Sequence, residues 1–167
     1  MALPNALSIS AITEPTELLS RVANERKKGL NYCGDIAPED AYEFLRFNQA
    51  VVVDVRTTPE WQFVGVPDLA GTKAKLATVS WKNYPDFSPN TQFAYEMSRI
   101  SGINKDTPLL FICRSGGRSL DAALAMTQAG YRYCFNIEGG FEGEPDAQGH
   151  RGTSQGWKAK KLPWKQG

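Results

Sequence analysis

The sequence predicts an α/β fold built on an open, mainly parallel sheet with helices on both faces. Strand-like apolar runs alternate along the chain with segments of helical spacing, which is the pattern of βαβ units. The runs at residues 50–55 and 109–112 are almost entirely apolar, as expected of strands that are buried on both faces. A length of 167 residues suits one domain with a hydrophobic core and is short for two.

The first half of the chain is expected to alternate between helices and strands. Residues 16–28 carry apolar side chains at helical spacing, with acidic residues early and basic residues late, and Gly29 suits a C-cap. The elements expected next are a short strand at 30–34, a helix at 39–47, a strand at 50–55, a helical turn that begins at 58–60 and a loop at 65–71.

The second half continues this alternation. A strand is expected at 73–81, and apolar residues at i, i+4 and i+7 within 93–100 predict a core-facing helix with Ser88 and Pro89 as its N-cap and first residue. After the strand at 109–112, a helix from about 119 to 128, a strand at 131–137 and a glycine turn at 139–143 are expected.

These elements predict three parts of the chain. Residues 1–29 form an N-terminal extension with one short helix, residues 30–143 form the α/β domain, and residues 144–167 form a basic tail. Little regular structure is expected after residue 139, although Trp157 and Trp164 indicate that the tail packs somewhere.

Composition excludes several classes of protein. A net charge of +1 gives no bias toward nucleic acid, and no apolar stretch approaches the length of a membrane span. The N-terminal residues lack the basic and apolar regions of a signal peptide. Cys33, Cys113 and Cys134 are an odd and sparse set, which predicts a reducing compartment such as the cytoplasm and no disulfide scaffold. No metal-binding spacing of Cys or His is present in the sequence.

The chain is organised around the loop that follows the strand at 109–112. Cys113 ends the strand, and the loop residues after it are Arg114, Ser115, Gly116, Gly117, Arg118 and Ser119. The two glycines can take positive φ, so the loop can curl and point successive N–H groups at one spot beside the start of a helix. This predicts an anion site that holds Cys113 and favours its thiolate, with Arg118 as the better candidate for anion contact.

Four segments in order resemble those of the rhodanese family, and together they cover roughly residues 35–143. These segments are IAPEDAYEFL at 36–45, VVVDVRTTPEW at 51–61, CRSGGRS at 113–119 and GYRYCFNIEGGFEG at 130–143. The resemblance implies a five-stranded parallel core and a sulfurtransferase without a cofactor. It implies that Cys113 accepts a sulfane sulfur as a persulfide, held by the loop amides of residues 114–119. A donor such as thiosulfate and an acceptor such as cyanide or a small thiol are implied as well.

The supporting residues and one departure from the family pattern are also informative. Asp54 and Arg56 are expected to form a structural salt bridge that braces the loop. Residues 64–69 replace the Gly-His-Ile-Pro-Gly-Ala stretch of most single-domain members and lack its histidine. This replacement leaves the identity of the acceptor open. His150 is not needed by a persulfide mechanism, and Cys134 is expected to be a buried filler.

Two alternative functions use a similar loop. Phosphatases and arsenate reductases of the cysteine-loop type carry the loop arginine six residues after the cysteine, whereas Arg118 stands five residues after Cys113. The shorter loop favours sulfur over phosphate. A relay module that hands the persulfide sulfur to one protein partner needs the same residues, so the sequence leaves that alternative open.

Overall fold

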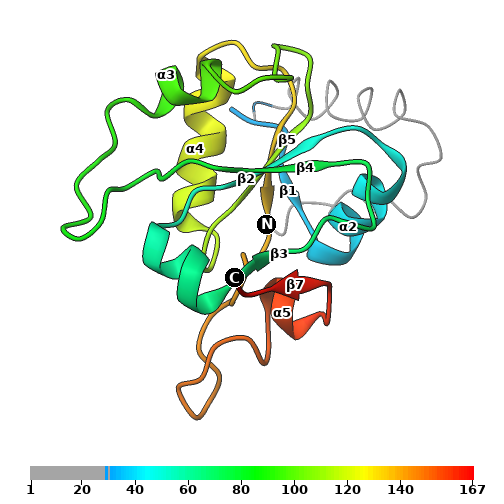
Figure 1. Cartoon of the computed structure of the whole chain (residues 1–167), viewed down its shortest axis with the longest axis vertical. Coiled ribbons are helices and arrows are strands. Elements are labelled where there is room, and N and C mark those ends of the chain that lie inside the picture. The colour runs from blue at the N-terminus through cyan, green and yellow to red at the C-terminus, as the bar shows by residue number, and fades with distance from the viewer. Residues whose placement is uncertain (1–28, 30) are drawn as a thin grey trace.

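The core of the protein is a five-stranded parallel sheet with the strand order β1-β6-β5-β2-β4 (Figure 1). The computed structural model describes residue 29 and residues 31–167, so the helix predicted at 16–28 lies outside the described residues. The strands of the sheet are β1 (Asp35–Ile36), β2 (Val51–Asp54), β4 (Lys75–Thr78), β5 (Leu109–Ile112) and β6 (Cys134–Ile137). This architecture confirms the predicted fold class.

The central strands are buried on both faces, as their apolar sequences predict. Every residue of β2, β5 and β6 is buried, and alternate side chains point into two separate cores. Val52 and Leu110 belong to one core, whereas Val53 and Phe111 belong to the other. The parallel register pairs Asp54 with the last residue of β5, so the carboxyl ends of the two strands meet at one edge.

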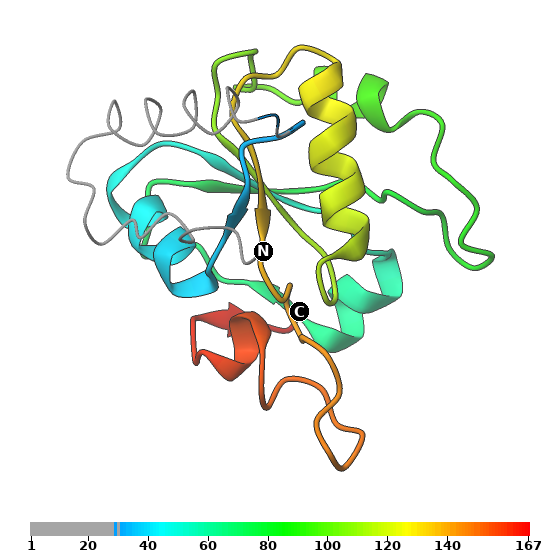
Figure 2. The same cartoon turned by 180° about the vertical axis from the view of Figure 1, so that it is seen from behind.

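Helices cover both faces of the sheet (Figure 2). On one face lie α2 (Pro38–Phe47) and the short α5 (Gly156–Ala159), and on the other lie α3 (Phe93–Ser98) and α4 (Gly117–Gln128). Pro38 stands at the first turn of α2, where its missing N–H costs no helical hydrogen bond. A π-helix, η2 (Glu60–Val64), follows the end of β2.

Three local predictions in the first hundred residues are wrong. The strand expected at 30–34 lies instead at Asp35–Ile36, because Gly34 has φ +112 and leaves the β region. The loop expected at 65–71 contains the strand β3 (Val66–Pro67). Helix α3 begins at Phe93 because Pro89 forms a β-bridge with Lys82 and closes the intervening loop.

The expectation of little regular structure after residue 139 is also wrong. The tail contains α5 and the strand β7 (Trp164–Lys165), which pairs antiparallel with β3. Trp157 of α5 is fully buried in the core between α2 and the sheet. The tail therefore packs against the domain, as its two tryptophans indicate.

Candidate functional site

Cys113 lies at the carboxyl end of β5 and is 1% exposed. The backbone N–H of Gly116 donates a hydrogen bond of 3.1 Å to its Sγ atom. The hydroxyl oxygen of Ser119 lies 3.2 Å from the same sulfur. The thiol is therefore held between a loop amide and a side-chain hydroxyl, both of which can donate to an anionic sulfur.

The loop after Cys113 is short because helix α4 begins early. Gly116 has φ +118 and makes the left-handed turn that the sequence predicts, whereas Gly117 is already the first residue of the helix. Arg118 and Ser119 consequently lie in the first helical turn, so the positive end of the α4 dipole lies next to the sulfur.

The glycine turn after β6 braces this loop from behind. The N–H of Phe141 donates to the carbonyl of Cys113 at 2.8 Å, and the N–H groups of Glu142 and Gly143 donate to the carbonyl of Arg114. A Cβ at Gly140 would lie only 2.5 Å from the Cys113 carbonyl oxygen. The close approach of the two backbones therefore requires glycine at this position.

Arg118 binds a carboxylate of the same chain. Its two terminal nitrogens donate to the two oxygens of Glu60 at 2.9 and 2.8 Å, and the Glu60 carboxylate also accepts from the backbone and hydroxyl of Thr57. Burial on its own raises the pKa of Glu60, but the hydrogen bonds and charge of Arg118 and the hydrogen bonds of Thr57 outweigh it. The pKa of Glu60 falls to about 2. This ion pair connects η2 with the first turn of α4, next to the loop that follows Cys113.

Glu60→Gln is expected to lower the free energy of unfolding at pH 7 by about 2 kcal/mol, because it leaves Arg118 without its charged partner. Since the pKa of Glu60 is lowered by folding, the wild-type advantage is complete above its usual value of 4.5 and disappears as the pH falls through about 2. Urea unfolding of both proteins from pH 7 down to pH 2.5 measures this difference.

Glu43→Gln is the matched control for that prediction. Glu43 pairs with Arg46 on the surface of α2 at 3.1 Å, where both side chains are more than two-fifths exposed. Exposed pairs of this kind contribute less than about 1 kcal/mol. Equal losses in the two variants, or a Glu60→Gln loss that does not change with pH, would contradict a special role for the partly buried pair of Glu60 and Arg118.

Asp54 and Arg56 form the predicted salt bridge and lie wholly within the protein. Arg56 donates from Nε and Nη2 to the two oxygens of Asp54 at 2.9 and 2.7 Å, and Nη2 also donates to the carbonyl of Gly65. The guanidinium lies 4.4 Å from the centre of the Phe141 ring. The pair thus connects the end of β2 with the turn that holds the loop after Cys113.

The other residues that the sequence singles out differ in their exposure. Arg114 is exposed and Ser115 is half-buried. His150 is exposed, and its backbone N–H donates to Asp146. Cys33 and Cys134 are fully buried, and each thiol donates to a nearby backbone carbonyl.

Sequence reasoning missed two partners of the loop. The sequence predicts no role for Glu60 and none for Asn136, whose amide oxygen accepts a hydrogen bond of 2.6 Å from the hydroxyl of Ser119. Asn136 is buried in a strand whose other residues are Cys, Phe and Ile. A lone amide in a strand buried on both faces is a signal that could have identified it.

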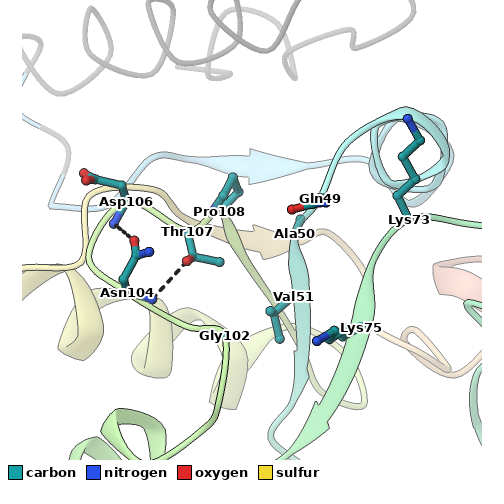
Figure 3. A pocket seen from close by; sticks show the side chains of 10 residues that line it. All are labelled: Gln49, Ala50, Val51, Lys73, Lys75, Gly102, Asn104, Asp106, Thr107 and Pro108. Atoms are coloured by element: carbon teal, nitrogen blue, oxygen red, sulfur yellow. Dashed lines mark hydrogen bonds between the residues drawn. The ribbon is translucent and has the colours of Figure 1, made fainter.

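A pocket of about 460 Å³ lies at the opposite end of the sheet (Figure 3). It is lined by residues at the amino ends of β2, β4 and β5, and it includes none of the site residues predicted from the sequence. Asn104 forms hydrogen bonds with Asp106 and Thr107 there.

Among the described residues, no cluster of three His, Cys, Asp or Glu side chains could hold a metal ion. In the same part of the chain, no helix has the length and apolar character that crossing a membrane requires.

A family model described as a rhodanese-like domain matches residues 37–143. The crystal structure of Rv0390 from M. tuberculosis is similar, with a TM-score of 0.72 and 44% identity, over 81% of this chain and 99% of that chain. The uncharacterized protein RC0915 of Rickettsia conorii is 40% identical over 78% of this chain and 95% of its own length. The thiosulfate sulfurtransferase GlpE of Pseudomonas aeruginosa is 31% identical over 64% of this chain and 79% of its own length.

Proposed function

This chain belongs to the rhodanese-like domain family, and on that basis we propose that it is a sulfurtransferase that carries sulfur as a persulfide on Cys113. The observation that supports this most directly is the position of the Cys113 sulfur at the end of β5, where it accepts the Gly116 N–H. The name of the relative from Pseudomonas aeruginosa supports thiosulfate as the donor.

The proposed reaction has two steps. The Cys113 thiolate attacks the outer sulfur of thiosulfate, the S–S bond of the donor breaks, and sulfite leaves with the bonding electron pair. Cyanide or a small thiolate then attacks the outer sulfur of the Cys113 persulfide. The S–S bond of the Cys113 persulfide breaks, and its electron pair stays on the Cys113 sulfur. The thiolate is thereby regenerated, and thiocyanate or a new persulfide leaves. A thiol that must stay reduced between turnovers fits a reducing compartment such as the cytoplasm.

Electrostatics of the loop support both steps. The Gly116 N–H and the amino end of α4 favour negative charge at the sulfur before attack and again when Cys113 leaves. Arg114 is exposed beside Cys113, and we assign to it the attraction of the thiosulfate dianion. The remaining backbone N–H groups of residues 114–119, which belong to the loop and to the first turn of α4, are assigned to the outer sulfur of the persulfide.

Phosphate chemistry is disfavoured by the state of Arg118. Both terminal nitrogens of its guanidinium are bound to Glu60, so the arginine that a cysteine-loop phosphatase would use for its substrate already has a carboxylate partner.

A protein that accepts the sulfur from Cys113 is the second candidate function, and exposed aromatic side chains favour it. Phe87, which is half exposed, lies 5.8 Å from the Arg118 guanidinium, and Phe63 on η2 is 75% exposed.

Intact mass after incubation with thiosulfate tests the proposal. The purified chain is expected to gain about 32 Da, to carry this sulfur on the peptide that contains Cys113, and to lose it to cyanide as thiocyanate. No adduct, or an adduct confined to Cys33 or Cys134, would refute the proposal. Hydrolysis of an aryl phosphate without any movement of sulfur would favour the phosphatase alternative.

A further inference from the structure

A network of hydrogen-bonding groups extends from Cys113 to the edge strand β1. The Ser119 hydroxyl lies 3.2 Å from the Cys113 sulfur and 2.6 Å from the amide oxygen of Asn136. The amide nitrogen of Asn136 donates to Asp35 at 3.1 Å, and the hydroxyl of Tyr32 donates to the same carboxylate oxygen at 2.8 Å. The network thus connects the Cys113 sulfur with the carboxylate of Asp35, which lies on a different strand.

The groups at the two ends of this network determine the orientation of the Asn136 amide. The Asp35 carboxylate can only accept hydrogen bonds, so the amide nitrogen of Asn136 must face it and the amide oxygen must face Ser119. The Ser119 hydroxyl has one proton but two acceptors, the amide oxygen and the Cys113 sulfur. It can donate to only one of them at a time.

Burial makes this choice energetically important. Ser119 is fully buried and Asn136 is 4% exposed, so bulk water does not replace a lost donor at the amide oxygen. While Cys113 is a thiol, its S–H can donate to Ser119, and Ser119 can donate to Asn136. When Cys113 ionises, the Ser119 proton is needed at the sulfur, and the amide oxygen of Asn136 loses its donor.

We propose that Asn136, held by Asp35, is a positioning residue that competes with the Cys113 sulfur for the single proton of Ser119. The inference rests on the proposed role of Cys113 as the nucleophile. The network opposes the free thiolate and favours the resting thiol. It also favours the persulfide, in which the negative charge has moved to the outer sulfur and Ser119 can donate to Asn136 again.

Other charges near the sulfur remain in place when Asn136 is replaced. The charged groups on the elements around Cys113 are Arg118 and Asp121 of α4, Glu60 of η2, Asp54 and Arg56 at the end of β2, Arg114 of the loop, Glu142 of the glycine turn and Asp35 of β1. Tyr32 is a further titratable group, and burial followed by its contact with Asp35 raises its pKa well above the usual value. Because replacement of Asn136 also removes a hydrogen bond from Asp35, comparison in a Ser119→Ala background is needed to trace a change in thiol reactivity to Ser119.

The test is the pH profile of alkylation of Cys113 by iodoacetamide, followed on the peptide that contains Cys113. In Asn136→Leu, the midpoint of the profile is expected to move to lower pH, and alkylation at pH 6 is expected to be about fivefold faster, which is the effect of about one hydrogen bond. The plateau rate at high pH is expected to be unchanged. In a Ser119→Ala background, Asn136→Leu is expected to leave the profile unchanged.

Several results would overturn the inference. They are an unchanged midpoint, a midpoint at higher pH, equal acceleration at every pH, or the same shift in the Ser119→Ala background. If circular dichroism shows that Asn136→Leu does not fold, Asn136→Ala carries the same expectation with a smaller side chain. Iodoacetamide needs no sulfur donor, so a shifted profile in a protein that gains no sulfur from thiosulfate would support the network and refute the sulfurtransferase proposal.

Discussion

Cys113→Ser is expected to abolish transfer of sulfur from thiosulfate to cyanide, with a loss of about 10³-fold or more in turnover. A serine hydroxyl is a poor nucleophile toward sulfur and cannot form a persulfide. The substitution is nearly isosteric at a site that is 1% exposed, and the Gly116 N–H can donate to an oxygen as it does to the sulfur. The fold is therefore expected to persist, and the loss of activity is expected to be chemical.

Thiocyanate formation measures this loss, and Cys33→Ser is the matched control. Cys33 is fully buried, and its thiol donates to the carbonyl of Arg132 at 3.1 Å, a hydrogen bond that a serine hydroxyl can also make. Cys33→Ser is expected to keep wild-type turnover. Residual turnover near the wild-type level in Cys113→Ser would exclude the persulfide mechanism, whereas a loss in folded Cys33→Ser would implicate a second thiol.

The sheet was predictable because its central strands are locally encoded. In β2 and β5, nearly every side chain is apolar and both faces are buried, so the sequence alone marks them as interior strands. The two-residue strands β3 and β7 carry no such signal, because their pairing joins residues about a hundred positions apart. Only the tryptophans of the tail indicated that it packs against the domain.

The site, like the sheet, combines features that neighbouring residues encode with contacts between residues that are distant in the sequence. The position of Cys113, the left-handed turn at Gly116 and the helix after it belong to one continuous stretch, and the sequence predicts them together, although α4 begins at Gly117 and not at about residue 119. The partners that hold this stretch are distant in the chain. Glu60 binds Arg118 from 58 residues away, and Asp35 accepts from Asn136 across 101 residues. Such pairings depend on the order of strands in the sheet.

Trp157→Ala is expected to lower the free energy of unfolding by about 3–5 kcal/mol, the usual cost of truncating a large buried aromatic side chain. Trp157 is fully buried in the core beside α2, it packs edge-on against Tyr42, and its indole N–H donates to the carbonyl of Pro163 at 2.7 Å. Urea unfolding measures the loss.

Trp164→Ala is the control for this prediction, because Trp164 is 40% exposed and is expected to cost about 1 kcal/mol or less. The larger loss at Trp157 is expected to affect the loop after Cys113. Burial of the Trp157 side chain holds its backbone in place, and the backbone N–H of Trp157 donates to the carbonyl of Gly140, in the turn whose next residue, Phe141, donates to the carbonyl of Cys113. Sulfur transfer in Trp157→Ala should therefore fail at a lower temperature than in wild type. Unchanged stability in Trp157→Ala would mean that the tail is dispensable for the fold. Equal losses in Trp157→Ala and Trp164→Ala would mean that burial of Trp157 does not hold the tail against the domain.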